Sequence, residues 1–308
     1  MIISASYKTD IPAFYGRWFM NRLRAGSCKT INPYGRQIYT VSLARPDVDG
    51  FVFWTRNLGP FLPDLAEVHR LGYPFLVQYT ITGYPRKLER AVASAKATVE
   101  HMKRIAAQFG PRAAVWRYDP VVITSETPVD FHRRNFAQLA AALEGTTDEV
   151  VISFAQIYRK TRINMDRAAR ESGLTWEDPA DEVKLGLAAE FTESARTHGM
   201  QLSTCSQNQY LVPGARPARC VDADRLSDVA GYRIAAPQKG NRPDCACAQS
   251  RDIGDYDTCP HGCIYCYAVL HQQLARDRFQ RHDPTSEFLW PPPESERPAT
   301  ECDRPTEP

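Results

Sequence analysis

Three cysteines near the C-terminal end of the sequence carry its clearest chemical signal. Cys259, Cys263 and Cys266 stand at the spacing CX3CX2C, in a short loop that contains Gly262. Thiolates are soft ligands that suit iron–sulfur clusters and zinc. Such a loop can wrap a four-iron cluster so that three sulfurs bind three irons, which leaves one iron open to bind a substrate. We therefore expect an open, three-cysteine 4Fe-4S cluster in this loop.

Four further cysteines precede this loop. The sequence has nine cysteines, of which seven lie between Cys205 and Cys266, whereas Cys28 and Cys302 stand apart and are expected to be unligated. Seven divide into three plus four, and four thiolates would close a second 4Fe-4S cluster that has no open iron. Because the spacing of the four is irregular, a zinc site or ordinary buried thiols are the alternatives. The four cysteines are Cys205, Cys220, Cys245 and Cys247.

The cysteine loop resembles the cluster-binding loop of the radical S-adenosylmethionine superfamily. The match includes Tyr265 before the last cysteine and Tyr267 and Ala268 after it. The resemblance implies that the three cysteines hold the cluster, that the open iron chelates S-adenosylmethionine, and that Tyr265 lies near the adenine. It further implies cleavage of S-adenosylmethionine to a 5′-deoxyadenosyl radical, with an electron donor such as flavodoxin or ferredoxin. His261, in the same loop, is expected to face solvent.

The whole chain also resembles an uncharacterised bacterial family, domain of unknown function 1848. The resemblance extends nearly full length, up to about Tyr267, and it supports the fold and the cluster rather than a reaction. The stretches that carry it are 6–15, 53–57, 80–84, 116–120, 203–205 and 252–254, followed by the cysteine loop.

Six short apolar runs that alternate with longer amphipathic segments must position these residues. Strands separated by helices imply parallel pairing with βα crossovers. The economical fold is α/β, a partial (β/α)6 barrel of the radical S-adenosylmethionine type, and a doubly wound open sheet is the alternative. That superfamily places its cysteine loop after the first strand, whereas here the loop follows the sixth. The expected strands are 2–6, 51–54, 75–80, 113–116, 150–154 and 201–204, and the expected helices are 10–24, 60–71, 88–109, 129–143, 165–172 and 179–198.

Polar residues follow each expected strand, and the carboxyl ends of parallel strands are where chemistry gathers in such folds. Lys8, Asp10, Arg117 and Asp119 are therefore the candidate catalytic residues, expected to contact a substrate in the barrel mouth. Asp10 is also a good helix cap. Together with Arg56, the basic residues at the strand ends favour a small-molecule substrate that carries phosphate or carboxylate.

Three regions are expected along the 308 residues. Residues 1–206 form the barrel, 207–282 form a cysteine-rich region that packs on the barrel mouth, and 283–308 form a disordered, Pro-rich acidic tail. No stretch is apolar enough to span a bilayer and no signal peptide is evident, so a cytoplasmic protein is expected. Disulfides do not persist in that compartment, and this favours the interpretation of the clustered cysteines as metal ligands.

Three classes of function follow from these features. A radical enzyme explains both the cysteine triplet and the polar strand ends. A zinc-stabilised module that binds nucleic acid or protein is the alternative, but zinc sites usually use paired CX2C knuckles. An electron carrier is the third class, but it needs little more than a cluster-binding fold, so the six βα units would be unexplained. The sequence therefore favours the radical enzyme, with its substrate unknown and nucleic acid still open as a substrate class.

Overall fold

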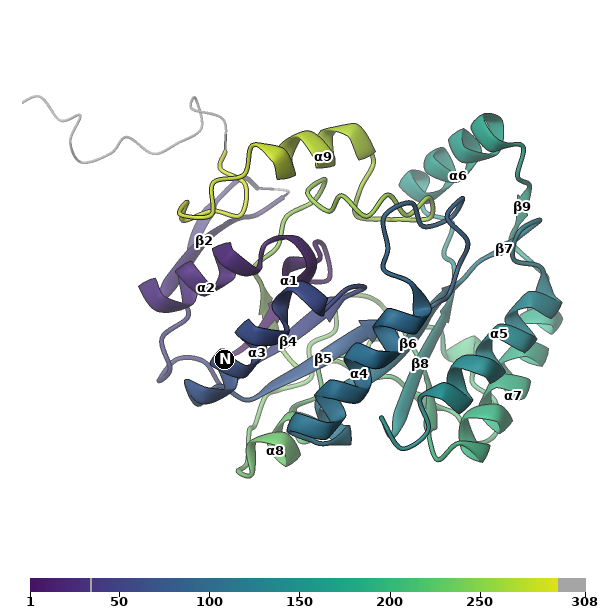
Figure 1. Cartoon of the computed structure of the whole chain (residues 1–308), viewed down its shortest axis with the longest axis horizontal. Helices are drawn as coiled ribbons and strands as arrows, with labels where there is room; N and C mark the ends of the chain where they lie inside the picture. Colours follow the sequence, from purple (N-terminus) through teal and green to yellow (C-terminus); the bar gives the residue numbers. More distant parts are fainter. Residues whose placement is uncertain (34, 293–308) are drawn as a thin grey trace, which may run out of the picture.

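The computed structural model describes residues 1–33 and 35–292 and shows a mixed α/β fold built on an eight-stranded sheet (Figure 1). Every neighbouring pair in this sheet is parallel. In order across the sheet, its strands are β11 (Arg216–Pro217), β10 (Gln201–Thr204), β8 (Glu149–Phe154), β6 (Ala114–Val121), β5 (Phe75–Thr80), β4 (Gly50–Thr55), β1 (Ile2–Ala5) and β12 (Ser250–Asp252).

From β1 to β10 the strand order follows the chain without a reversal. A doubly wound sheet needs a reversal at its switch point, so that alternative is not the arrangement present. All six strands expected from the sequence are found. The region 207–282 adds a strand at each edge, because β11 pairs with β10 and β12 pairs with β1. The cysteine-rich region is therefore continuous with the sheet.

Helices cover one face of the sheet (Figure 1). Apolar residues on both faces of the strands explain why the central strands read as continuous hydrophobic runs. Phe51 and Phe53 belong to the core shared with the helices, and the residue between them, Val52, belongs to the core on the other face. The helices are α1 (Ile11–Phe14), α2 (Gly16–Ala25), α3 (Leu62–Arg70), α4 (Ala95–Phe109), α5 (Val129–Ala142), α6 (Arg159–Ser172), α7 (Asp181–Thr197), α8 (Ala223–Ala230) and α9 (Gln272–Gln280).

The opposite face is covered by α8 and the loops around it. Leu226 of α8 and Ile234 pack with Val52 and Leu76 in a second core that also contains several cysteines. Two small antiparallel pairs lie outside the main sheet and complete the fold. They are β2 (Ser27–Ile31) with β3 (Ile38–Ser42), and β7 (Ile123–Thr124) with β9 (Trp176–Glu177).

Several boundaries differ from the sequence expectation. The helix α6 begins at Arg159 instead of 165, β6 extends to Val121 instead of 116, and the helix expected over 10–24 is divided into α1 and α2. The helix expected over 88–109 begins only at Ala95, where the Ser94 side chain accepts a hydrogen bond from the Ala97 backbone N–H, so 88–94 form a loop. The disordered tail expected from residue 283 is wrong for 283–292, where Leu289 is buried and the Trp18 indole donates to the Ser286 carbonyl. The rest of that tail, 293–308, lies outside the described residues.

No helix in the described part of the chain has both the length and the apolar character needed to cross a membrane.

Candidate metal centre

The carboxyl ends of the strands meet at one edge of the sheet, because the strands are parallel. Asp10 follows β1, Arg56 follows β4, Arg117 and Asp119 lie in β6, and Cys205 follows β10. Both groups of cysteines lie at this edge, since one contacts Asp10 and Arg56 and the other contacts Arg117. The structure thus brings the residues expected at the strand ends together with the cysteines.

The loop with Cys259, Cys263 and Cys266, here called the triplet loop, runs from β12 to α9. The Ile264 backbone N–H donates to the Leu88 carbonyl at 3.0 Å. On its other side, the Asn164 side chain of α6 donates to the Val269 carbonyl at 2.7 Å. Gly262 has φ +73°, a conformation that favours glycine, and it turns the chain between the first two cysteines. The loop is therefore fixed by neighbours on both sides.

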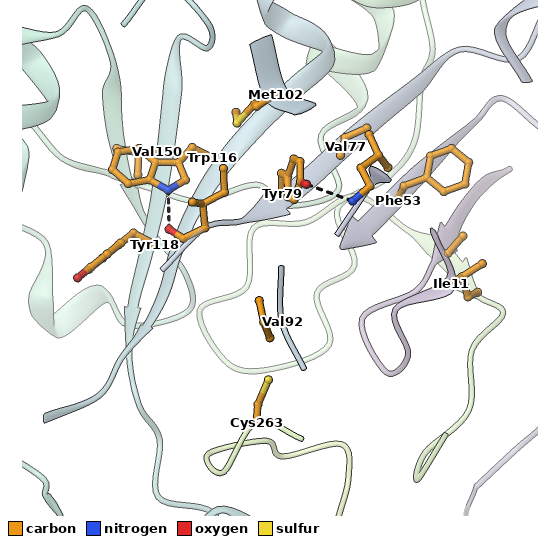
Figure 2. Close-up of a cluster of buried hydrophobic side chains, with 14 of the residues drawn as sticks. Ile11, Phe53, Val77, Tyr79, Val92, Met102, Trp116, Tyr118, Val150 and Cys263 are labelled. Carbon is orange, nitrogen blue, oxygen red and sulfur yellow. Dashed lines mark hydrogen bonds between the residues drawn. The ribbon is translucent and has the colours of Figure 1, made fainter. Parts of the chain in front are cut away.

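The surroundings of the triplet thiols affect their pKa values. Burial raises the pKa of Cys259 to about 12 and raises the pKa values of Cys263 and Cys266 above the ordinary thiol range. Two backbone N–H groups donate to the sulfur of Cys259 and two to that of Cys266, and such donors favour the thiolate. Figure 2 shows the sulfur of Cys263 directed toward Val92. A coordinating metal would displace the thiol protons, and the amide donors would then stabilise the bound thiolates.

Asp10 connects this loop to the sheet. One carboxylate oxygen accepts a hydrogen bond from the Ala13 backbone N–H, which caps α1, and the other accepts from the Arg56 backbone N–H at 2.7 Å. The second oxygen also lies 2.7 Å from Nε2 of His261. His261 is only 3% exposed, so the expectation that it faces solvent is wrong. Because all its contacts are internal, Asp10 holds the loop and the strand ends in place.

Glu89 is a functional candidate that the sequence reasoning missed. It lies in the loop before α4 and is 3% exposed. One of its oxygens accepts hydrogen bonds from Arg56 at 2.6 Å, Thr82 at 2.7 Å and the Tyr265 hydroxyl. The Arg56 guanidinium also lies over the Tyr265 ring. The only sequence signal was the position of Glu89 shortly after a strand end, and the expected helix over 88–109 concealed it.

The other four cysteines, here called the quartet, come from three segments. Cys205 and Cys220 have their sulfurs 3.7 Å apart. Cys247 lies near enough to influence the pKa values of both Cys220 and Cys245, which links the four thiols in series. The neighbouring Cys247 thiol is the largest of the influences that lower the pKa of Cys245 to about 5. The structure thus brings together all four cysteines that the sequence grouped.

Arg117 and Asp119 lie between the two cysteine groups. Arg117 is 4% exposed and donates to Asp119, to Gln78 at 3.1 Å and to the Cys220 sulfur at 2.9 Å. The Asp119 carbonyl accepts from Arg56 at 3.3 Å. Polar contacts therefore run from the quartet to the Arg56 network beside the triplet loop. The Arg117 donors face partners within the chain, which gives this residue a positioning role.

Lys8 lies at the rim of the same edge. Its ammonium is 3.6 Å from a carboxylate oxygen of Asp252 and 5.4 Å from the centre of the Tyr256 ring. Lys160 lies over the same ring at 4.9 Å. Tyr267, next to the last triplet cysteine, is 43% exposed. Aromatic rings and ammonium groups thus line this side of the edge, where an anionic group would be attracted.

Two cavities lie near the sheet. One of about 240 Å³ is lined by residues of the loop before α4, including Thr82 and Glu89, and so adjoins the network around Tyr265. A larger one of about 580 Å³ lies against α8, and neither cysteine group contributes to its lining. Within 1–33 and 35–292, no three or more Cys, His, Asp or Glu side chains converge as a ready-made site for one metal ion.

The profile of one protein family matches residues 2–268 of the chain, which is most of its length, and its description is "Domain of unknown function (DUF1848)". The chain belongs to this family. The family membership names no reaction, so the chemistry has to be argued from the site itself.

Two solved structures show distant likenesses to the chain. A D-hydantoinase is 9% identical with a TM-score of 0.30, and the match covers 74% of this chain and 44% of that one. A triazine hydrolase variant is 11% identical with a TM-score of 0.29, covering 66% and 45%. The match thus spans less than half the length of either structure. No curated protein matches the chain.

Proposed function

We propose that this member of the DUF1848 family is a radical S-adenosylmethionine enzyme whose triplet cysteines hold an open 4Fe-4S cluster. The sheet would then be the partial (β/α) barrel of that superfamily, with the cluster at the carboxyl ends of its strands. When bound, such a cluster supplies the electron that splits a carbon–sulfur bond of S-adenosylmethionine into methionine and a 5′-deoxyadenosyl radical.

The observation that carries the proposal is the position of β12. The superfamily's loop follows the first strand of its barrel, whereas this triplet loop comes late in the chain. In space, however, β12 pairs with β1 on the side away from β4. Counted from this edge, β12 is the first strand of the sheet and the triplet loop leaves its carboxyl end. The spatial arrangement therefore fits the superfamily, although the chain order differs.

The residues around the triplet fit the proposed group. Three sulfurs come from one fixed loop, backbone amides donate to two of them, and the Arg56 guanidinium lowers the pKa of Cys263 against the effect of burial. Arg56 and Glu89 also hold the Tyr265 side chain, which we propose lies near the adenine. Asp10 and His261 would keep the loop in register with the strand ends.

The substrate would enter over the same edge. Lys8 and its aromatic neighbours support a small anionic substrate, with Arg117 and Asp119 shaping the floor of the site. The electron would come from a separate donor such as flavodoxin or ferredoxin. We also propose a cytoplasmic location, because an open iron–sulfur cluster is best preserved in a reducing compartment.

Anaerobic purification tests the proposal. Wild type, Cys263→Ala and the control Cys28→Ala are reconstituted with iron and sulfide, reduced, and assayed for 5′-deoxyadenosine. Cys28 is a buried cysteine of β2 that belongs to neither group. Wild type and Cys28→Ala should hold about four irons in the triplet site and form the nucleoside, and Cys263→Ala should lose both. Zinc without iron under the same conditions would instead favour the binding module.

A further inference from the structure

The quartet offers a metal site of a different kind. We propose that Cys205, Cys220, Cys245 and Cys247 bind a single tetrahedral zinc or iron ion, in place of the second 4Fe-4S cluster expected from the sequence. The argument rests on how close the sulfurs are, on what donates to them, and on what the segment between β10 and β12 needs in order to fold.

Sulfur spacing separates the two kinds of site. Four thiolates around one ion, with metal–sulfur bonds of about 2.3 Å, lie about 3.8 Å from one another at the corners of a tetrahedron. The thiolates of a four-iron cluster bind four different irons, so the cluster core keeps them well apart. The sulfurs of Cys205 and Cys220 are 3.7 Å apart, and Cys247 lies near enough to influence the pKa values of both Cys220 and Cys245. The Cys205–Cys220 separation is too short for sulfurs that bind two different irons of a cluster, but it matches one edge of a single-ion site.

To bind a single ion, the four sulfurs still have to turn toward one common point. Each cysteine has a single χ1 torsion with three staggered positions, so its sulfur moves without a backbone change. Cys245 has the most room to do this, because it is the only member of the quartet that is not fully buried. An ion that binds Cys205, Cys220 and Cys247 can therefore recruit Cys245 last.

Hydrogen-bond donors already surround the quartet sulfurs. The Val221 backbone N–H donates to Cys247 at 3.4 Å, and the guanidinium groups of Arg117 and Arg242 donate to Cys220 at 2.9 Å and to Cys205 at 3.6 Å. A divalent ion with four thiolates carries a net charge of −2, so charged donors stabilise it. Such donors orient and tune metal-bound thiolates.

The surrounding segment explains what the ion would do. Between β11 and β12 the described chain contains one helix, α8, and otherwise loops. This segment covers the second face of the sheet, to which it is joined by the Gln78 side-chain bond to the Cys220 carbonyl at 2.9 Å. Loop-rich units of this kind gain much of their folding energy from a structural metal. The ion would fasten the segment to the sheet and, through Arg117, fix Asp119 at the strand ends.

The test removes the triplet, so that it does not depend on the proposed function. A variant with Cys259, Cys263 and Cys266 all changed to Ala is purified anaerobically and analysed for metals, acid-labile sulfide and free thiols. About one zinc or iron per chain, with no sulfide, is the expected result. The metal should fall at least tenfold when Cys220→Ala is added, and stay when Cys28→Ala is added instead.

Three results would overturn the proposal: about four irons with matching sulfide, absence of metal with all four thiols free, or a Cys205–Cys220 disulfide. Should these variants fail to fold, the wild type is purified with added zinc, and X-ray absorption at the zinc edge, to which the cluster irons do not contribute, decides the matter. Four sulfurs at about 2.3 Å without a metal neighbour support the single ion. A metal neighbour, or fewer than four sulfurs, contradicts it.

Discussion

Glu89 places a buried negative charge beside the triplet loop, where it joins Arg56, Thr82 and Tyr265. Changing it to the isosteric Gln leaves the Arg56 guanidinium buried without its carboxylate. Breaking a buried ion pair in this way costs about 3–5 kcal/mol. We expect the free energy of unfolding of Glu89→Gln, measured by urea titration, to fall by that order and the reconstituted protein to lose iron faster.

The matched control for this change is Glu67→Gln. Glu67 pairs with Arg70 within α3 at the surface, where water screens the interaction, so little change is expected. Equal losses of unfolding free energy in the two variants would show that the Glu89–Arg56 ion pair contributes no more to stability than a surface pair.

His132 gives the fold a pH dependence. Its Nδ1 lies 2.9 Å from the Tyr118 hydroxyl and its Nε2 lies 3.0 Å from the Val122 carbonyl, within the core. Burial lowers its pKa to about 4, from an ordinary value of 6.5. Between pH 6.5 and pH 4, His132 therefore binds a proton in the unfolded chain but not in the folded chain. This contribution is complete above pH 6.5 and is lost as the pH falls toward 4.

The size of that contribution is about 3 kcal/mol. Between pH 7 and pH 4, the wild type should therefore lose about 3 kcal/mol more unfolding free energy than His132→Gln, which has no titrating imidazole. His271→Gln, at an exposed position, should follow the wild type. Parallel pH curves for the wild type and His132→Gln would refute a neutral, buried His132.

Residues differed in how far the sequence predicted them. The seven clustered cysteines stood out because they lie close together in the chain, and their role as metal ligands stays a prediction. Glu89 was hidden, since an amphipathic pattern continues N-terminally from α4 although the helix begins only at Ala95. His261 was expected in solvent because nothing local shows that Asp10, 251 positions away, lies against it. Partners that are distant in the chain are therefore what the sequence did not reveal.

At the scale of elements, one side chain adds to the backbone pairing that holds β12 against β1. The Asp252 carboxylate accepts from the Ser4 and Ser6 hydroxyls at 2.9 and 2.8 Å and from the Tyr7 backbone N–H at 3.1 Å. Asp252→Ala removes all these bonds and should loosen β12 from β1. We expect faster amide hydrogen exchange over 250–258 and weaker iron retention, because the triplet loop starts from this strand.

Asp49→Ala serves as the control for this change. Asp49 forms an exposed ion pair with the N-terminus, so its loss should leave exchange over 250–258 as it is in the wild type. Unchanged exchange in Asp252→Ala would mean that β12 is held by its backbone pairing alone.

Long apolar strands and helix caps were predictable, and β12 was not. Runs such as Phe75–Thr80 show their burial in their composition, and Gly26, with φ +76°, ends α2 where a left-handed cap is expected. Ser250, Arg251 and Asp252 have no apolar signal, since β12 is a three-residue edge strand held by polar side chains. Its pairing with β1 is visible only in the folded chain.

On the scale of the whole molecule, the order of the strands in the chain differs from their order in the sheet. The last strand of the chain is the first in the sheet, so the triplet loop reaches the strand edge from beside β1. The βα rhythm predicted the parallel sheet, because local patterns define strands and crossovers. It did not predict that region 207–282 would supply both edges, since edge pairing is a long-range contact.

The central claim is that the triplet holds an iron–sulfur cluster with a site for S-adenosylmethionine. Electron paramagnetic resonance of the anaerobically reconstituted, reduced protein, recorded with and without S-adenosylmethionine, tests it most directly. We predict a four-iron signal that changes shape when S-adenosylmethionine is added, persists in Cys28→Ala and is absent in Cys263→Ala. A signal that S-adenosylmethionine leaves unchanged, or one that survives in Cys263→Ala, would contradict the account.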